Sequence, residues 1–437
     1  MGFADQYLDK QKGFSPYFAD QPSQQLRYAV VIPAYREPDL TQALQALWDC
    51  ARPYGHVEVI VVVNSPEHAP LSVKEASHHT LESASAWIRE HQDPGFRYLL
   101  MDKTDLPDRD AGVGLARKTG MDEALVRFNR ISIPGGFILS FDADSRCDSN
   151  YFTAIESTIQ QDPTLQGFDV YFEHPLEGND FPEKVYRGIT GYELHLRYLN
   201  LFMRFTGFPF AHHTVGSCFG VRAETYAAQG GMSKRKAGED FYFLHKIIPL
   251  GHFTDITGTR VIPSPRASDR VPFGTGVSIG KFLSSETEDM MTYSPDCFLL
   301  LRSLFKHTGG MYKRSSAQIM RMMDQFPEPL HQYLSEVDAL NAINEINANC
   351  RSVNSFTHRF YRWFDAFRIV KFLNYASRSR FGQVPVQEAA LRFLEVAGYE
   401  FQGDISNTLG LLKIFRELER GSMVSGNQEA DTVIRPQ

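Results

Sequence analysis

The sequence lacks several features that define particular classes of protein. Its five cysteines are widely scattered and form no Cys-x-x-Cys pair, so neither a zinc site nor a disulfide framework is indicated. No stretch approaches the run of about eighteen apolar residues that a membrane span needs, and the N-terminus has no cationic start followed by an apolar core. We therefore expect a soluble protein in the reducing cytoplasm, with no transmembrane segment. The cysteines are Cys50, Cys147, Cys218, Cys297 and Cys350.

The chain also lacks an excess of positive charge. Its net charge of -7 argues against a protein that binds nucleic acid. The 437 residues, 43% of them hydrophobic, are enough for two domains, or for one large domain with an appendage.

Strand and helix patterns alternate in the first third of the sequence. Apolar or β-branched runs at 28–33, 57–63, 96–101 and 137–141 predict strands. Amphipathic stretches at 40–50, 83–90 and 113–128 predict the helices between them. This alternation predicts an α/β fold with a right-handed, mostly parallel, Rossmann-like sheet of the nucleotide-binding type.

The remaining chain is less regular. A strand at 168–172, a long amphipathic helix at 182–205 and a helix at 241–250 are expected, followed after about residue 285 by helices. We expect the following regions: an N-terminal arm at 1–27, the α/β domain at 28–285, an α-helical C-terminal region at 286–420 and a disordered tail at 421–437.

One helical stripe in the C-terminal region contains Phe356, Phe360, Trp363 and Phe367. Basic residues beside it leave peripheral contact with a membrane surface open. A packed helical domain with solvated basic edges is the interpretation that we favour.

Two carboxylates follow the fourth predicted strand. Asp142 and Asp144 would lie at the sheet edge where open α/β sheets bind ligands. Carboxylates at i and i+2 can share one divalent cation, and Mg²⁺ bound in this way usually completes its shell with substrate phosphates. The alternative is a loop whose Asp residues cap the next helix, and the motif alone does not decide between the two.

A second acidic pair, Glu239 and Asp240, follows Gly238 at the start of a predicted helix. Taken alone, the pair is typical of negative charge that complements the helix dipole. Arg117 lies near the start of another helix, after a glycine-rich turn. It could reach a phosphate or a sugar, or it could be an ordinary surface arginine.

Together these motifs resemble those of the family 2 glycosyltransferases, which have the GT-A fold. They occur in the family's order and cover roughly residues 28 to 280, but not the helical region. The resemblance implies an inverting enzyme, of hexosyltransferase type, that moves a sugar from a nucleotide diphosphate sugar to a hydroxyl acceptor. The matching segments are 31–35, 111–117, 142–144 and 238–240.

The resemblance also implies roles for single residues. Asp240 would be the general base, with Glu239 beside it as a cap or acceptor contact. Asp144 and Asp142 would hold Mn²⁺ or Mg²⁺, which neutralises the leaving diphosphate. Two arginines in a Pro- and Gly-rich segment could close over the diphosphate, or could simply be solvated. The implied donor-binding residues are Pro33, Tyr35, Glu37, Asn64, Arg117, Asp142, Arg266 and Arg270.

The sequence departs from the family's pattern after the second strand. The family commonly has Asp residues there, whereas this chain has Asn64. An amide can still donate and accept hydrogen bonds at a base edge, so the nucleobase stays open. The membrane helices and the Gln-x-x-Arg-Trp motif of processive members are absent, which favours single transfers. A third metal ligand remains unassigned among His212, His213, His245 and His252.

Three other functions agree less well with the sequence. A phosphatase of the haloacid dehalogenase type would use Asp142 as nucleophile, but its motif normally follows the first strand, and here three βα units precede it. A nucleotidyltransferase would need a Gly-rich, Lys-bearing loop where this chain has Ala34–Glu37. A catalytically silent sugar-nucleotide-binding protein would not need both acidic motifs. The sugar and the acceptor are not specified by the sequence.

Overall fold

The computed structural model describes residues 2–11, 13–268, 270, 274–285, 289–400 and 403–421. The chain divides into two compact units. The first comprises Met1–Gly178 and His212–Val277, and the second comprises Asn179–Ala211 and Ser278–Gln437. The segment 179–211 thus joins the helical unit, although we expected it within the domain at 28–285. Of the tail predicted to be disordered, residues 422–437 lie outside the described residues.

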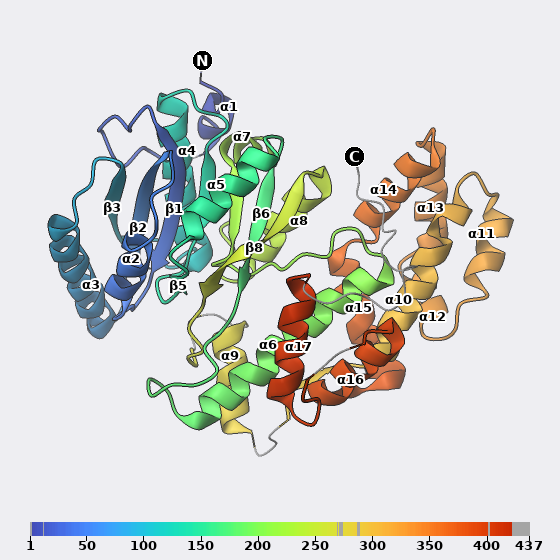
Figure 1. Ribbon diagram of the computed structural model, residues 1–437. Helices are drawn as coiled ribbons and strands as arrows, with labels where there is room; N and C mark the ends of the chain where they lie inside the picture. The colour runs from blue at the N-terminus through green and yellow to red at the C-terminus, as the bar shows by residue number, and fades with distance from the viewer. Residues whose placement is uncertain are drawn as a thin grey trace. The chain divides into compact units, whose positions relative to one another are not determined.

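The first unit is built on a mostly parallel sheet (Figure 1). Within the described residues it has eight strands, in the order β3-β2-β1-β4-β7-β6-β8-β5. Strands β1 to β4 are parallel, β7 runs antiparallel between β4 and β6, and β6 pairs in parallel with β8. The strands are β1 Leu26–Ala34, β2 His56–Pro66, β3 Phe96–Leu106, β4 Phe137–Ser140, β5 Arg146–Cys147, β6 Gly167–Phe172, β7 Phe219–Arg222 and β8 Phe253–Ile262.

Helices cover both faces of this sheet, which explains why β1 and β2 are apolar almost throughout. Helices α2 Leu40–Trp48, α3 Leu71–Glu90 and α5 Tyr151–Gln161 lie on one face, and α4 Val113–Arg130 and α7 Ala223–Ala228 lie on the other. Helix α8, Glu239–Ile247, follows α7 along the chain. The predictions of an α/β fold, a mostly parallel sheet and a helical C-terminal region are confirmed.

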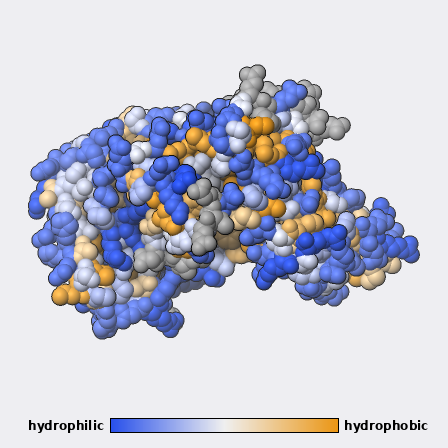
Figure 2. Space-filling view, turned by 90° about the horizontal axis from the view of Figure 1, so that it is seen from below, coloured by the Kyte–Doolittle hydropathy of each residue, from blue (hydrophilic) through white to orange (hydrophobic). Residues whose placement is uncertain are grey.

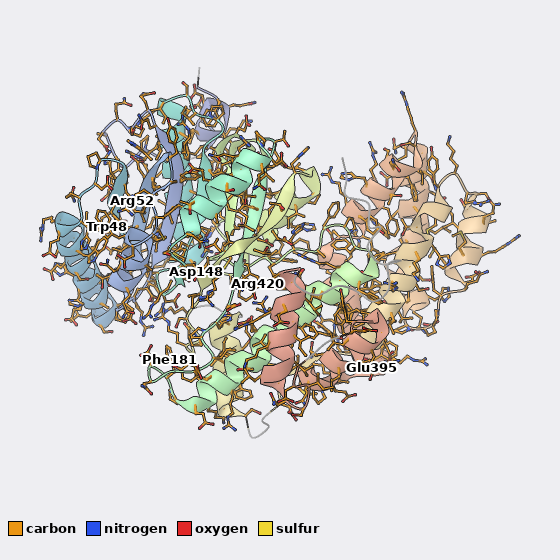
Figure 3. The ribbon with its side chains drawn as sticks, viewed as in Figure 1. Trp48, Arg52, Asp148, Phe181, Glu395 and Arg420 are labelled. Carbon is orange, nitrogen blue, oxygen red and sulfur yellow. The ribbon has the colours of Figure 1, made fainter. Side chains whose placement is uncertain are left out.

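An aromatic cluster fixes α2 against α3. The indole of Trp48 meets that of Trp87 edge to face, with 6.3 Å between the ring centroids. The guanidinium of Arg52 lies 4.6 Å from the Trp48 ring centroid and also pairs with Asp93. Trp48 and Arg52 are labelled in Figure 3, on the side of the unit that carries α3.

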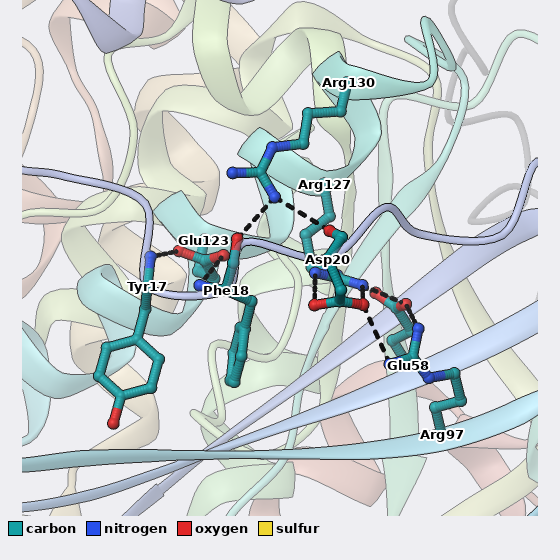
Figure 4. Close-up of polar contacts among 8 residues, drawn as sticks. All are labelled: Tyr17, Phe18, Asp20, Glu58, Arg97, Glu123, Arg127 and Arg130. Atoms are coloured by element: carbon teal, nitrogen blue, oxygen red, sulfur yellow. Dashed lines mark hydrogen bonds and ion pairs between the residues drawn. The ribbon is translucent and has the colours of Figure 1, made fainter.

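The N-terminal arm is fixed to α4 by buried polar contacts (Figure 4). The backbone N–H groups of Tyr17 and Phe18 donate to the carboxylate of Glu123, at 2.8 and 3.3 Å. Asp20 pairs with Arg127 at 3.2 Å, and Arg127 also pairs with Glu58 of β2 at 2.7 Å. Because these contacts use backbone groups and isolated charges, they leave no periodic pattern in the sequence.

The second unit is helical, with a small sheet of β9 Met291–Tyr293 and β10 Gln383–Pro385. Arg197 of α6 pairs with Glu193, and Arg416 of α17 also pairs with Glu193 at 2.8 Å, which joins α6 to this unit. The helices are α6 Glu183–Thr206, α9 Thr275–Ser284, α10 Pro295–His307, α11 Ser316–Met323, α12 Leu330–Glu336, α13 Ala339–Ala348, α14 Val353–Trp363, α15 Ala366–Ala376, α16 Val386–Ala397 and α17 Thr408–Glu419.

The aromatic stripe of α14 contributes to the core of the second unit. Phe356 and Phe360 are fully buried, and the ring of Phe360 stacks on Phe364. No helix among the described residues is both long enough and apolar enough to cross a bilayer. On the face shown in Figure 2, hydrophilic residues predominate and hydrophobic ones gather in separate small groups.

Candidate functional site

The carboxyl ends of β1, β2 and β4 bring the predicted site residues to one edge of the sheet. In the register of these parallel strands Ala34 lies opposite Val63, and Val31 lies opposite Ser140. The residues that follow each strand therefore emerge side by side. They are Tyr35 and Glu37 after β1, Asn64 at the end of β2, and Asp142 and Asp144 after β4. This edge is where open α/β sheets bind their ligands.

Arg117, in the first turns of α4, joins the two acidic motifs. Its guanidinium pairs with Asp142 Oδ1 at 2.5 Å and with Glu239 Oε1. Burial lowers the pKa of Arg117, but the charges of Asp142 and Glu239 more than compensate, so its pKa lies above the usual value. With only 3% of its side chain exposed, Arg117 is not a surface residue. Its contacts indicate that it positions two carboxylates about a hundred positions apart in the sequence.

Asp240 and Glu239 face different partners. The side chain of Glu239 is buried against Arg117, whereas Asp240 is partly exposed and its Oδ1 accepts a hydrogen bond from the Phe241 backbone at 2.7 Å. Burial, followed by the charge of Glu239, raises the pKa of Asp240 to about 7 against the opposing effect of Arg117. A carboxylate with a pKa near neutrality is well suited to accept a proton.

A second arginine bridge joins the β1 end to the β4 end. The Arg266 guanidinium lies 2.7 Å from Asp144 Oδ2 and also pairs with Glu37 Oε1. Arg270 pairs with the same Glu37 oxygen and donates to the Arg36 carbonyl at 3.0 Å. The Pro- and Gly-rich segment therefore reaches the strand ends. Within the described residues, Glu37 Oε2 is buried and has no hydrogen-bond partner.

Asp142 and Asp144 fit a divalent cation. Burial, together with the negative charge of Asp142, raises the pKa of Asp144 above its usual value, although Arg266 opposes the shift. The arginine contacts use Oδ1 of Asp142 and Oδ2 of Asp144, and each carboxylate has a second oxygen for an ion. Oxygen ligands of this kind are those that Mg²⁺ and Mn²⁺ prefer.

The ends of β1 and β2 offer polar groups for a donor nucleotide. Asn64 is buried, and its Oδ1 has no hydrogen-bond partner in the part of the chain that the structure describes. A buried amide oxygen of this kind can accept a bond from a ligand. Pro33 is buried in β1 opposite Val62, and Tyr35 is half-buried at its end. Burial and the charge of Arg36 lower the pKa of Arg270 to about 10, so this cation remains charged at neutral pH and can bind a phosphate.

The four histidines considered as a third metal ligand make other contacts. His252 precedes β8, so it lies at the opposite edge of the sheet, where it bonds to Thr164 at 2.8 Å. His212 Nδ1 lies 2.5 Å from Asp255 Oδ1. The ring of His213 packs on Phe172, and that of His245 packs on Phe241. None of these contacts assigns a third ligand beside Asp144.

Gly216 is a site residue that sequence reasoning missed. Ser140 Oγ donates to the Gly216 carbonyl at 2.6 Å, which ties the segment 212–218 to β4. A Cβ on Gly216 would lie 3.0 Å from Asp240 Oδ2 and 3.2 Å from the Arg117 guanidinium. The glycine therefore lets the backbone approach both groups. Gly216 is the single glycine of the segment 212–218, and nothing in its local sequence indicates this role.

Comparison with known proteins finds similar solved structures, at low sequence identity. No family model matches the sequence, and a search of curated proteins finds no match. The structure of S. aureus TarS 1–349 is 14% identical in sequence, with a TM-score of 0.38. The complex of TarS 1–349 with UDP-GlcNAc is 12% identical, with a TM-score of 0.41, and the complex with UDP is 13% identical, with a TM-score of 0.39. Each match covers 78% of this chain and 93% of that chain. Similarity at this level establishes neither a family nor a function.

Proposed function

We propose that this protein is a metal-dependent, inverting glycosyltransferase of the GT-A type that moves a sugar from a nucleotide diphosphate sugar to a hydroxyl acceptor. The observation that carries the proposal is the bridge made by Arg117, which holds the acidic pair at Glu239 and Asp240 beside Asp142 at the ligand-binding edge. The strand order β3-β2-β1-β4, which matches the first four strands of the doubly wound nucleotide-binding order 3-2-1-4-5-6, supports it.

Donor binding would use Asn64, the arginines of the second bridge and the two aspartates after β4. Asn64 would hydrogen-bond the nucleobase, and Arg266 and Arg270 would turn from Glu37 and Asp144 towards the diphosphate. Asp142 and Asp144 would hold Mn²⁺ or Mg²⁺, which supplies charge neutralisation for the leaving diphosphate when bound.

Transfer would proceed in one displacement. Asp240 would accept the proton of the acceptor hydroxyl while that oxygen attacks the anomeric carbon from the side opposite the diphosphate. The new C–O bond forms as the bond to the diphosphate breaks, so the configuration inverts. Glu239, held by Arg117, would keep a negative charge beside Asp240 and so keep its pKa high. Glycosidases differ, because they use two carboxylates to hydrolyse the bond.

The alternatives agree less well with the structure. A phosphatase of the haloacid dehalogenase type carries its nucleophile after the first strand of its fold, but Asp142 follows β4, the fourth strand along the chain. A silent binding protein would have no use for a partly exposed carboxyl group with a pKa near 7.

A panel of nucleotides and nucleotide sugars, tested by thermal shift with and without Mn²⁺, examines the proposal directly. Binding at a hundredfold excess over Kd stabilises the folded protein by about 2.7 kcal/mol. Stabilisation by a nucleoside diphosphate or its sugar that requires Mn²⁺ is expected. If no member of the panel stabilises the protein, the proposed donor class is wrong.

Asp144→Asn should weaken metal-dependent binding of the nucleoside diphosphate found in this way. Asn keeps the shape of Asp but not the charge that a hard cation prefers. We expect a loss at least as large as the roughly 10–100-fold typical of weaker perturbations near metal sites. Isothermal titration calorimetry would measure it, with the exposed Asp39→Asn as matched control. Unchanged affinity in Asp144→Asn would remove this residue from the metal site.

The rate of transfer should depend on pH in the direction set by Asp240. Only the ionised form can accept a proton, so kcat/KM should rise with pH and level off above about 7. Glu239→Gln removes a charge that raises this pKa, so the rise should move to lower pH. A series of rate measurements from about pH 5 to about pH 9 tests both statements. A profile that is flat in this range would argue against Asp240 as the titrating base.

A further inference from the structure

A second group of possible metal ligands lies in the first unit, formed by residues that the proposed mechanism does not use. Asp169 of β6 and Asp255 of β8 lie opposite each other in the parallel register, and His212 precedes β7. His212 Nδ1 lies 2.5 Å from Asp255 Oδ1 and 3.9 Å from Asp169 Oδ2. One ligand atom from each of the three residues lies within 4.8 Å of the other two.

We propose that Asp169, His212 and Asp255 bind a divalent transition-metal ion. One imidazole nitrogen and two carboxylate oxygens form a donor set that suits Zn²⁺ or Mn²⁺. Asp142 and Asp144 offer oxygen alone, so the two sites differ in chemistry. A cation also offsets the repulsion between two carboxylates that face each other on neighbouring strands.

The surroundings hold these ligands in place. The His213 backbone N–H donates to Asp169 Oδ2 at 3.1 Å, and Asp169 is only 4% exposed. The ring of Phe253 packs against the edge of the His212 imidazole, with 4.8 Å between the centroids. Such contacts around the ligands fix their orientation at metal sites.

Binding exchanges a hydrogen bond for metal–ligand bonds. The imidazole must be neutral at Nδ1 to donate its lone pair, so any proton held there leaves to solvent as the ion binds. The His212–Asp255 hydrogen bond then breaks, and one bond to the ion forms from each of the three residues.

The proposed ion would position the backbone segment that runs from His212 to Gly216. His212 begins the segment that reaches Gly216, and Gly216 packs against Asp240 and Arg117. An ion at His212 would tie the start of this segment to β6 and β8, while Ser140 holds its far part to β4. The ion touches no reacting group, so it would act by fixing the backbone beside Asp240.

Calorimetric titration of the full chain with Zn²⁺ tests the site, after treatment with a chelator and without nucleotide. We expect one ion per chain in the wild type and in Asp144→Asn, and at least about tenfold weaker binding in His212→Gln. Asp255→Asn should behave like His212→Gln. His252→Gln is the matched control, because this half-exposed histidine lies at the other edge of the sheet and should leave binding unchanged.

Three results would overturn the proposal. Wild-type affinity in His212→Gln, with circular dichroism showing an intact fold, would exclude the imidazole as a ligand. Failure of the wild type to bind either Zn²⁺ or Mn²⁺ would show that these three residues hold no such ion. If Asp144→Asn alone lost the ion, the ion would be assigned to the proposed donor site and not to His212. Because no nucleotide is present, failure of the proposed transferase function would leave the outcome unaffected.

Discussion

Asp240→Asn should lower kcat by about 10²–10⁴-fold while donor affinity and stability stay close to wild type. The amide keeps the size of the carboxylate, and its oxygen can still accept the 2.7 Å hydrogen bond from the Phe241 backbone. What is lost is the group that takes the acceptor's proton. The affected quantity is therefore the rate of transfer and not the binding of the nucleotide.

The experiment compares three variants by release of nucleoside diphosphate, with donor affinity measured in parallel. Glu239→Gln leaves the buried Arg117 with one charged partner fewer, so it should cost stability, up to the roughly 3–5 kcal/mol of a broken buried pair. Glu224→Gln is the matched control, because this exposed acid lies in the first turn of α7, as Glu239 does in α8, and no side-chain contact among the described residues links it to the site.

The outcomes separate the roles of the two carboxylates. If Asp240→Asn transfers sugar at a near wild-type rate while a folded Glu239→Gln is inactive, Glu239 is the base. If both variants are as active as Glu224→Gln, the pair only complements the dipole of α8.

Arg127→Met should lower the free energy of unfolding of the first unit by about 3 kcal/mol. The side chain is fully buried and pairs with Glu58, which is 2% exposed (Figure 4). Removing one partner of a buried pair leaves the other charge uncompensated, at a cost of roughly 3–5 kcal/mol. We expect the lower end of that range, because Arg97 remains 3.6 Å from Glu58.

A double-mutant cycle with Glu58→Leu isolates the pair. The double variant should recover much of the stability, since no buried charge is then left without its partner. Arg109→Met is the control, because Arg109 is 93% exposed and its pair with Asp110 should contribute under about 1 kcal/mol. If Arg127→Met costs no more than Arg109→Met, water reaches Glu58 and the pair is not effectively buried.

The measurement has to report on one unit at a time, since a chain of two units need not unfold in a single step. The sequence has three tryptophans, and Trp48 and Trp87 belong to the first unit while Trp363 belongs to the second. Urea unfolding in a Trp363→Phe background would therefore follow the first unit by fluorescence.

The sequence predicted the strands whose surroundings are uniform. The run from Val57 to Val63 is apolar except at Glu58 because both faces of β2 are covered, and such a run is visible without knowledge of its partners. Strand β7 was missed because it has four residues, among them Gly220, where a Cβ would overlap the ring of Phe168. The need for glycine at this position comes from Phe168, a neighbour that is distant in the sequence.

The same distinction applies to the site. Asp142, Asp144, Glu239 and Asp240 could be predicted as site residues because each motif is defined by spacing along the chain. The partners of Arg117 were not, because a buried arginine takes whichever carboxylates the fold brings to it. Helix α6 was expected within the α/β domain at 28–285, yet the ion pair between its buried Glu193 and Arg416 joins it to the helical unit.

The contacts of the N-terminal arm with α4 make the arm part of the first unit. A chain that began at β1, without the arm, would keep every motif named above. It would also expose Glu123 and Arg127 to water without the backbone donors and the carboxylate that Tyr17, Phe18 and Asp20 supply. Those charges lie on α4, the helix whose first turns position Arg117. A domain boundary chosen only to include the motifs would therefore remove contacts that stabilise α4, the helix that carries Arg117.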